Sequence, residues 1–362
     1  MNLTFVVQRY GHTISGGAEA HARWMAERLA QRHKVDVMTT CALDYRDWKN
    51  HFPEGPTKEN GIPVVRYPVD RPRSEREFAL YSDIVFRDAH SLADEHEWVI
   101  RNGPYTPALV RALREREDTD RFLFYSYRYY HTCYGLPEVA GRAILIPTAE
   151  EDPAVHLSVF KDLFRAPRGL LYLTPEERAL VQSVSDNASI PSAVIGVGVE
   201  PPTDWERIDV RTRYDLPSDF LLYVGRVDAN KGVDGLIAHF RRAYADWPRF
   251  PTLVLAGQVA LDIREHPKIR YLGKISDDEK YSLMDACELL IMPSPFESLS
   301  ITVLEAWAMR RPVLVNAKAR PMEGQCLRSG GGLFYDGDAE FEGDGYFHLI
   351  LLFLIEPRGG EP

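Results

Sequence analysis

Residues 293–312 constrain the fold of this 362-residue chain more than any other stretch. They follow an apolar run, Leu289–Met292, which is typical of a strand buried inside a parallel sheet. Prolines end this strand, and residues 300–310 have the composition of a helix. A second apolar run, residues 313–315, comes next. The stretch therefore predicts a strand, a loop, a helix and another strand. Its loop lies at the carboxyl end of a parallel strand, where α/β proteins bind ligands.

Two carboxylates and a helix start give this stretch the features of a binding site. Glu297 precedes the predicted helix and Glu305 lies within it, so both side chains can face one crevice. A phosphate flanked by hydroxyl groups suits such a site, because the first N–H groups of a helix lack intrahelical partners and bind anions. Those N–H groups belong to Leu299, Ser300, Ile301 and Thr302. In the alternative interpretation, Glu297 only complements the helix dipole and Glu305 is a solvated surface residue.

The positions of these glutamates resemble a known signature. Glu297, seven intervening residues, Glu305 and then Arg311-Pro312 are similar to the two-glutamate motif of retaining glycosyltransferases of family 4. That family has the GT-B fold, in which two Rossmann-like domains flank a cleft. The resemblance implies that Glu305 binds the ribose of a nucleotide diphosphate sugar and that Glu297 binds the sugar. The motif usually has glycines at the positions of Ser298 and Ser300.

A loop with two cations and two glycines follows another predicted strand, Phe220–Val224. Its sequence, residues 225–232, contains Arg226 and Lys231. Arginine binds phosphate in a bidentate manner and lysine adds a point charge, so the loop suits a diphosphate. Taken by itself, the loop fits a solvated turn equally well, and its spacing is not that of a P-loop. In the resembled family, cations at these two positions hold the donor diphosphate and stabilise the leaving group.

A glycine pair marks the first turn of the chain. A strand predicted at residues 3–7 leads into a loop, and Gly16 and Gly17 then precede a helix that extends to about residue 32. Paired glycines let a backbone approach a ligand, although they serve tight packing more often. The pattern is not the G-x-G-x-x-G of dinucleotide sites, which argues against a nicotinamide enzyme. It resembles the family's loop near the donor phosphates, so both glycines are candidate donor-binding residues.

Glu150 lies where the resembled family often has a histidine beside the donor sugar. A carboxylate accepts a hydrogen bond from a sugar hydroxyl, but it cannot replace an imidazole. The next two residues, Glu151 and Asp152, are also acidic, and mutual repulsion is expected to raise the pKa of at least one of the three. The candidate catalytic residues are Arg226, Lys231, Glu297 and Glu150.

Three further segments of the N-terminal half carry predictions. Residues 78–97 predict one helix, and the apolar residues 98–100 predict a strand. Residues 125–134 are rich in tyrosine, and they fit either stacking on sugar rings or ordinary packing of a strand end.

The alternation of strands and helices indicates an α/β chain with two domains. We place an acceptor-side Rossmann-like domain at residues 1–200 and a nucleotide-sugar-binding one at residues 201–362, with a hinge at residues 200–202. The C-terminal sequence departs from the family pattern beyond about residue 342, so the helices that cross back onto the first domain are expected to be truncated.

Charge and cysteine spacing narrow the class of protein. The net charge of -10 argues against a nucleic-acid partner. The four cysteines lack the spacing of a zinc or redox site, and no signal peptide is evident, so we expect a cytoplasmic protein. A local basic patch remains compatible with this charge, and peripheral contact with the inner face of a membrane is a second expectation.

The resemblance implies a retaining enzyme that moves a hexose-type sugar from a nucleotide diphosphate sugar to a hydroxyl acceptor, in glycan or glycolipid synthesis. The acceptor would be a saccharide, a lipid-linked glycan or a small molecule. Because arginine, lysine and helix N–H groups would stabilise the departing diphosphate, neither a metal nor another cofactor is expected. Two alternatives remain. One is another GT-B enzyme, such as a nucleotide-sugar epimerase or a phosphorylase, and the other is a nucleotide-sugar-binding protein without turnover.

Overall fold

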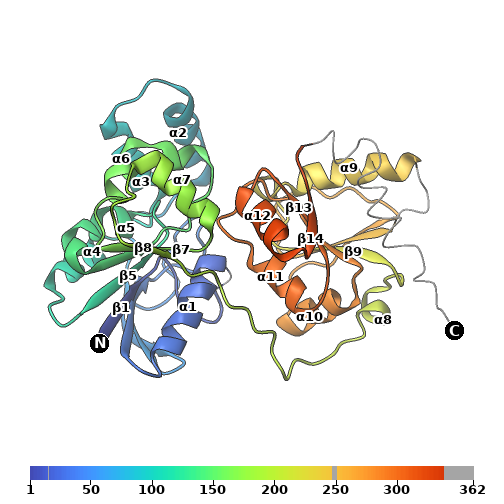
Figure 1. Ribbon diagram of the computed structural model, residues 1–362, viewed down its shortest axis with the longest axis horizontal. Helices are drawn as coiled ribbons and strands as arrows, with labels where there is room; N and C mark the ends of the chain where they lie inside the picture. The colour runs from blue at the N-terminus through green and yellow to red at the C-terminus, as the bar shows by residue number, and fades with distance from the viewer. Residues whose placement is uncertain (15, 247–250, 338–362) are drawn as a thin grey trace. The chain divides into compact units, whose positions relative to one another are not determined.

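The computed structural model describes residues 1–337 except 15 and 247–250. Contacts divide the chain into two units, Met1–Val197 and Gly198–Pro362. The described part of each unit contains one sheet with helices packed on it (Figure 1). The predicted boundary at residue 200 lies close to this division. Within the described residues, no helix combines the length and the apolar composition needed to cross a bilayer.

The first unit is built on an eight-stranded sheet in the order β3-β4-β2-β1-β5-β6-β7-β8. All pairs are parallel except β3 with β4. From β1 the chain adds strands first on one side and then, from β5 onwards, on the other, so the strand order reverses between β1 and β5. The strands are β1 Asn2–Val6, β2 Lys34–Thr40, β3 Gly55–Glu59, β4 Ile62–Tyr67, β5 Arg121–Tyr125, β6 Ala143–Ile146, β7 Gly169–Tyr172 and β8 Ser192–Val194.

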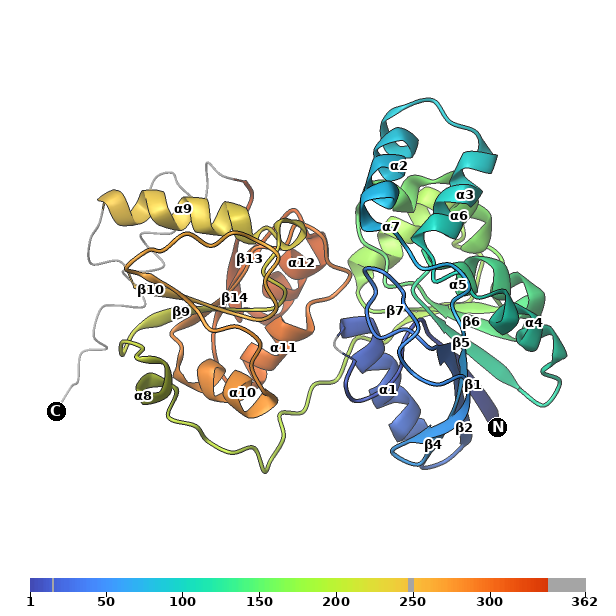
Figure 2. The ribbon, with the colours of Figure 1, turned by 180° about the vertical axis from the view of Figure 1, so that it is seen from behind.

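Helices cover both faces of this sheet (Figure 2). Val6 and Met38 pack on one face with buried side chains from α2, α3 and α4. On the opposite face, Phe5 stacks on Tyr125, whose ring contacts His21 of α1. The helices are α1 Gly17–Leu29, α2 Glu75–Arg87, α3 Leu92–Asn102, α4 Pro107–Glu115, α5 Tyr130–Gly135, α6 Ser158–Leu163 and α7 Pro175–Ser185, with 3-10 turns at Pro137–Arg142 and Pro153–His156.

Two predictions for this unit are wrong. Residues 78–97 do not form one helix, and residues 98–100 are not a strand, because the chain forms the two helices α2 and α3 instead. Ser91 and Asp94 make a capping box that starts α3: the Ser91 Oγ accepts from the Asp94 N–H, and the Asp94 carboxylate accepts from the Ser91 N–H. Trp98 then lies on the buried face of α3, where an apolar run serves a helix as well as a strand.

Among its described residues, the second unit contains six parallel strands in the order β11-β10-β9-β12-β13-β14. This is the order of the classic dinucleotide-binding sheet, and it reverses between β9 and β12. The strands are β9 Phe220–Val224, β10 Thr252–Ala256, β11 Ile269–Tyr271, β12 Leu289–Met292, β13 Val313–Asn316 and β14 Gly332–Tyr335. The helices are α8 Val210–Tyr214, α9 Val233–Asp246, α10 Asp277–Ala286, α11 Ile301–Ala308 and α12 Arg320–Ser329, with a 3-10 turn η3 at Ala229–Lys231.

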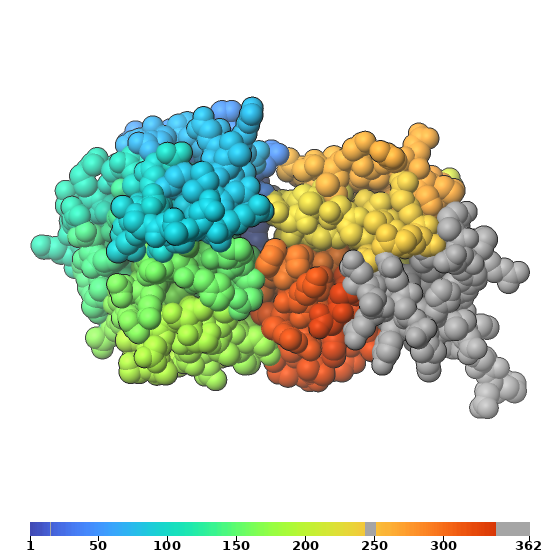
Figure 3. Space-filling view, turned by 90° about the horizontal axis from the view of Figure 1, so that it is seen from above, coloured from blue at the N-terminus to red at the C-terminus, as the bar shows by residue number. Residues whose placement is uncertain are grey.

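The predicted α/β architecture of two parallel-sheet domains is confirmed. Residues 293–312 lie between β12 and β13 and contain α11, as their sequence predicts. Figure 3 shows α9, in yellow, at the surface of the second unit. The expected loss of the terminal crossover helices concerns residues that lie outside the described part of the chain.

Substitution of Gly232 tests how closely the backbone is packed at this position of the second unit. Its φ is +69°, and a Cβ added there would lie 2.5 Å from the carbonyl oxygen of Pro293. We therefore expect Gly232→Ala to destabilise the unit by roughly 1–3 kcal/mol and to lower the melting temperature measured by calorimetry. Gly235→Ala is the matched control, because that glycine lies inside α9 with nothing within 4 Å of its added Cβ. Equal melting temperatures for the two variants would contradict the close contact.

Candidate functional site

Two loops lie side by side where the strand order of the second sheet reverses. The loop 225–232 follows β9, and the loop 293–300 follows β12. Because β9 and β12 are adjacent and parallel, both loops leave the same edge of the sheet. Gly232 lies against Pro293, so the two loops are in contact. Residues that are distant in the sequence therefore meet at this edge.

Lys231 and Glu297 form the direct link between the two loops. The Lys231 Nζ donates to the Glu297 Oε1 at 2.7 Å, and both side chains are largely buried. Glu297 is therefore paired with a cation. It does more than complement the helix dipole, which is all that the alternative interpretation gives it. A cation and a carboxylate 66 residues apart in the sequence are brought into one place.

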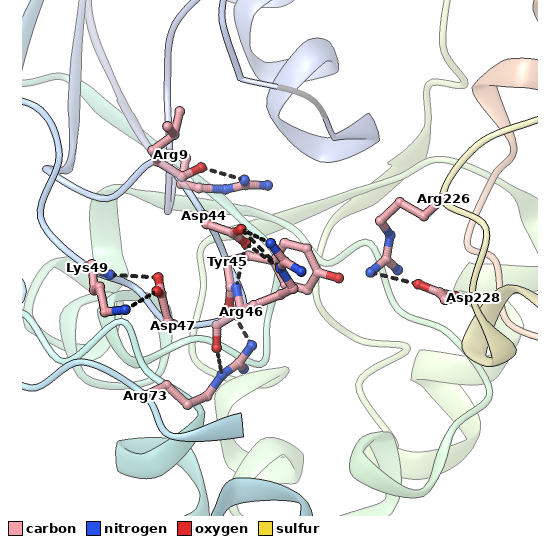
Figure 4. A network of polar contacts seen from close by, with 10 residues as sticks. Arg9, Asp44, Tyr45, Arg46, Asp47, Lys49, Arg73, Arg226 and Asp228 are labelled. Carbon is pink, nitrogen blue, oxygen red and sulfur yellow. Dashed lines mark hydrogen bonds and ion pairs between the residues drawn. The ribbon is translucent and has the colours of Figure 1, made fainter. Parts of the chain in front are cut away.

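Arg226 begins the first of these loops and has a carboxylate partner. The Arg226 Nη1 lies 3.1 Å from the Asp228 Oδ2 (Figure 4). Asp228 also caps the turn η3, since its Oδ1 accepts from the Lys231 N–H at 2.9 Å. The Arg226 side chain is 37% exposed, so part of it is open to solvent.

The helix α11 starts as predicted. Ser300 is its N-cap, and the Ser300 Oγ accepts from the Val303 N–H. The helix begins at Ile301, so the N–H groups of Ile301 and Thr302 are the first of the helix, whereas Leu299 and Ser300 precede it. An anion placed there would meet free N–H donors and the positive end of the helix dipole.

Glu305 is buried within α11, so the alternative in which it is a solvated surface residue is wrong. Its Oε1 accepts from the Lys280 Nζ at 2.8 Å and from the Tyr281 hydroxyl at 3.1 Å. Burial alone would lower the pKa of Lys280, but Glu305, Tyr281 and Asp277 together raise it above its ordinary value. Both donors come from α10 and were missed from the sequence, where only a helix was recognised there.

In the first unit, the predicted glycine pair lies at the start of α1. Gly16 is the N-cap, Gly17 is the first helical residue, and both are exposed. A Cβ at Gly16 would lie 2.2 Å from the Glu19 carboxylate, which forms a buried ion pair with Arg9 at 2.6 Å. The structure thus shows a packing reason for Gly16. The proposed contact of either glycine with a ligand stays a prediction.

Arginines also hold the loop after β2 (Figure 4). The Arg9 Nη1 donates to the Leu43 carbonyl at 2.9 Å. The Arg73 guanidinium donates to the carbonyl groups of Arg46, at 2.8 Å, and of Tyr45. The sequence does not indicate how this segment is held, because bonds from side chains to distant carbonyl groups leave no local pattern.

Glu150 follows β6 and is half-buried. The segment before it is strained, since Thr148 has a φ of 49° and its Oγ1 lies 2.9 Å from the Oγ of Ser126, which has a φ of 64°. Next to Thr148, the Ala149 N–H donates to the buried Glu177 Oε1 at 2.8 Å. The Leu173 N–H donates to the other oxygen of this carboxylate, so Glu177 ties the ends of β6 and β7 together.

The three adjacent acids do not form one cluster of repelling groups. Asp152 pairs with Arg128, and the Glu151 Oε1 lies 2.6 Å from the Nε2 of His156. The tyrosines of residues 125–134 also serve packing: Tyr125, Tyr127 and Tyr130 are buried, and the ring of Tyr127 packs edge-on against Phe160. Packing is therefore the better of the two interpretations of that segment.

Comparison with known proteins gives a family match for part of the chain and a fold for most of it. Residues 218–340 match the family described as glycosyl transferases group 1. An uncharacterised glycosyltransferase of Methanocaldococcus jannaschii is 22% identical over 361 residues, covering 89% of this chain and 82% of the relative. These findings support a glycosyltransferase. They do not distinguish its subtype, its donor or its stereochemistry.

Solved structures identify the fold of this glycosyltransferase. A sucrose-phosphate synthase from Thermosynechococcus elongatus has a TM-score of 0.71 at 16% identity, covering 98% of this chain and 90% of that one. A trehalose-6-phosphate structure from E. coli, bound with UDP-2-fluoro glucose, has a TM-score of 0.70 at 11% identity, with coverage of 99% and 92%. The chain has the GT-B fold.

Substitution of Glu177 tests the contacts that hold the segment just before Glu150. Burial raises the pKa of Glu177 from 4.5 to about 8, and the charge of Glu150 adds to the increase. A carboxyl whose pKa is raised in the folded state stabilises the fold fully below its unfolded pKa and loses that contribution as the pH rises toward 8. We expect wild type to lose stability relative to Glu177→Gln across this range, by on the order of a few kcal/mol.

Melting temperatures measured at several pH values check this expectation. Glu176→Gln, an identical change at the preceding residue, is the control and should follow the wild-type pH dependence. A constant difference between wild type and Glu177→Gln from acid to mildly alkaline pH would contradict the raised pKa.

Proposed function

We propose that the chain is a retaining glycosyltransferase of family 4 that transfers a hexose-type sugar from a nucleotide diphosphate sugar to a hydroxyl acceptor. The contact between Lys231 and Glu297 carries this proposal, because it joins a cation suited to a diphosphate with a carboxylate suited to sugar hydroxyls. The match of residues 218–340 to glycosyl transferases group 1 covers both loops and supports it.

Each group at the edge of the second sheet has a role in this reaction. Arg226, Lys231 and the N–H groups of Leu299, Ser300 and Ile301 would bind the diphosphate and stabilise its charge as it departs. Glu305 would accept from the ribose, and Glu297 would accept from the transferred sugar. These groups need no metal ion to stabilise the leaving group, and we propose that none takes part.

The proposed transfer exchanges one bond for another on the same face of the sugar. The bond from the anomeric carbon to the phosphate oxygen breaks, and the acceptor oxygen bonds to that carbon. The acceptor proton passes to the departing phosphate, so no covalent enzyme intermediate is required. Glu150, which follows the hydrogen-bonded segment at the end of β6, is proposed to accept a hydrogen bond from a sugar hydroxyl.

The acceptor and the setting of the reaction are also proposals. A saccharide, a lipid-linked glycan or a small alcohol would supply the acceptor hydroxyl in glycan or glycolipid synthesis. The reaction would take place in the cytoplasm, with the option of contact at the inner face of a membrane. The bound UDP-2-fluoro glucose of the E. coli structure makes UDP a sensible first nucleotide to test.

Binding of UDP and GDP, measured by calorimetry, tests the donor site. We expect wild type to bind one of them and Arg226→Ala to bind it at least about tenfold more weakly, because a charge-assisted bond to phosphate is lost. Arg270→Ala is the matched control, since it removes the same charge from the edge strand β11. The proposal fails if folded wild type binds neither nucleotide, or if both variants bind as wild type does.

Substitution of Asp228 is expected to strengthen nucleotide binding rather than to weaken it. Its carboxylate pairs with Arg226 and would compete with a diphosphate for that guanidinium. Asparagine also caps helices and turns, so Asp228→Asn should keep η3 while removing the competing charge. We expect the variant to bind the preferred nucleotide severalfold more tightly, most clearly at low salt.

Asp215→Asn is the control for this charge change, because Asp215 is exposed at the end of α8 and has a left-handed backbone that asparagine tolerates. Weaker binding by Asp228→Asn than by this control would show that Asp228 assists the ligand rather than competing with it.

A further inference from the structure

Glu305 has two donors that the proposed reaction does not use. Lys280 and Tyr281 are neighbours in α10, whereas Glu305 belongs to α11. Both donors bond the same oxygen, Oε1, at 2.8 Å from the Lys280 Nζ and at 3.1 Å from the Tyr281 hydroxyl. The side chains of Lys280 and Glu305 are 18% and 7% exposed, so this group is enclosed by the fold.

The two oxygens of the Glu305 carboxylate differ in their contacts. A carboxylate oxygen accepts about two hydrogen bonds. Oε1 already accepts two, while Oε2 has no partner among the described residues. Lys280 is itself held by Asp277, whose Oδ1 lies 3.1 Å from its Nζ, and it lies over the ring of Tyr281. The carboxylate is therefore fixed in direction, with one oxygen left to accept.

Stability alone does not require this arrangement. Apolar side chains of the same volume often stabilise a core as well as a buried ion pair does, because both charges must lose their water. What apolar side chains would not supply is a charged oxygen held in one direction. A precisely oriented acceptor is useful where a site must distinguish a ligand that has a hydroxyl from one that lacks it.

We propose that Lys280 and Tyr281 are positioning residues, which hold Glu305 so that Oε2 accepts from a ribose hydroxyl and thereby select ribonucleotide donors over deoxyribonucleotide donors. This inference rests on the proposed function, because it assumes that a nucleotide occupies the edge of the second sheet. It adds a selectivity that neither residue type nor sequence position indicates.

Calorimetry with paired nucleotides tests the selectivity. The probes are UDP, GDP and the 2′,3′-dideoxy form of whichever of them binds wild type. We expect wild type to bind the ribonucleotide at least about tenfold more tightly than the dideoxy form, since the site would leave Oε2 unpaired in the latter. Lys280→Met should reduce this ratio toward one, and Tyr281→Phe should reduce it in part.

Two comparisons separate positioning from a merely structural role. Lys280→Arg keeps a cationic donor and should restore most of the ratio, while affinity for the dideoxy form should stay within about twofold of wild type in every folded variant. Lys268→Met removes a lysine ahead of β11, at the opposite edge of the sheet, and should leave the ratio unchanged. If Lys280→Met does not fold, the affinity ratio measured for Tyr281→Phe tests the proposal instead.

The possible failures are distinct. No binding of either ribonucleotide by folded wild type would overturn the proposed function and this inference together. Binding of ribonucleotide and dideoxy form with equal affinity by wild type would overturn the inference alone. So would a wild-type ratio that persists in the folded Lys280 and Tyr281 variants.

Discussion

The reversal of strand order between β9 and β12 determines where chemistry is possible in the second unit. Parallel strands end at one edge of a sheet, and a reversal leaves two neighbouring loops there without a crossover helix between them. Here the loops touch through Gly232 and Pro293, so each supplies side chains to the other. The ion pair of Lys231 with Glu297 joins the same two loops.

The charged side chains proposed for the donor site lie in ion pairs. Arg226 pairs with Asp228, Lys231 with Glu297, and Lys280 with Glu305. Such pairing holds long side chains in defined positions before any ligand arrives, which lowers the entropy lost on binding. It also means that an anionic ligand gains less than an isolated cation would offer, because each carboxylate competes with it. Selectivity is favoured over raw affinity in a site of this kind.

The sequence was most informative where a pattern is local. The apolar run Leu289–Met292, the cap Ser300 and the α/β alternation predict the second unit closely. Prediction failed at residues 98–100, because three apolar residues fit a buried helix face as well as a strand and only the capping box at Ser91 distinguishes the two.

Contacts between distant residues were beyond sequence reasoning. Lys280 and Tyr281 carry no motif, and their role follows only from the packing of α10 beside α11. Asp228 belongs to a loop whose sequence indicates a cationic site, although the fold makes it the partner of Arg226. The roles assigned to Glu150, Gly16 and Gly17 come from resemblance, and their geometry in the first unit neither requires nor opposes those roles.

The strand order has a further consequence for folding kinetics. β9 and β12 are neighbours in the sheet, but β10, β11 and their connecting segments come between them in the chain. The partners Lys231 and Glu297 are 66 residues apart, so their contact belongs to the high-contact-order part of the topology. Closing so long a loop is slow and entropically costly, and it must precede the meeting of the two loops. A nascent chain therefore lacks this edge until α11 has been synthesised, and assembly of the binding groups coincides with the pairing of β9 and β12 at the centre of the sheet.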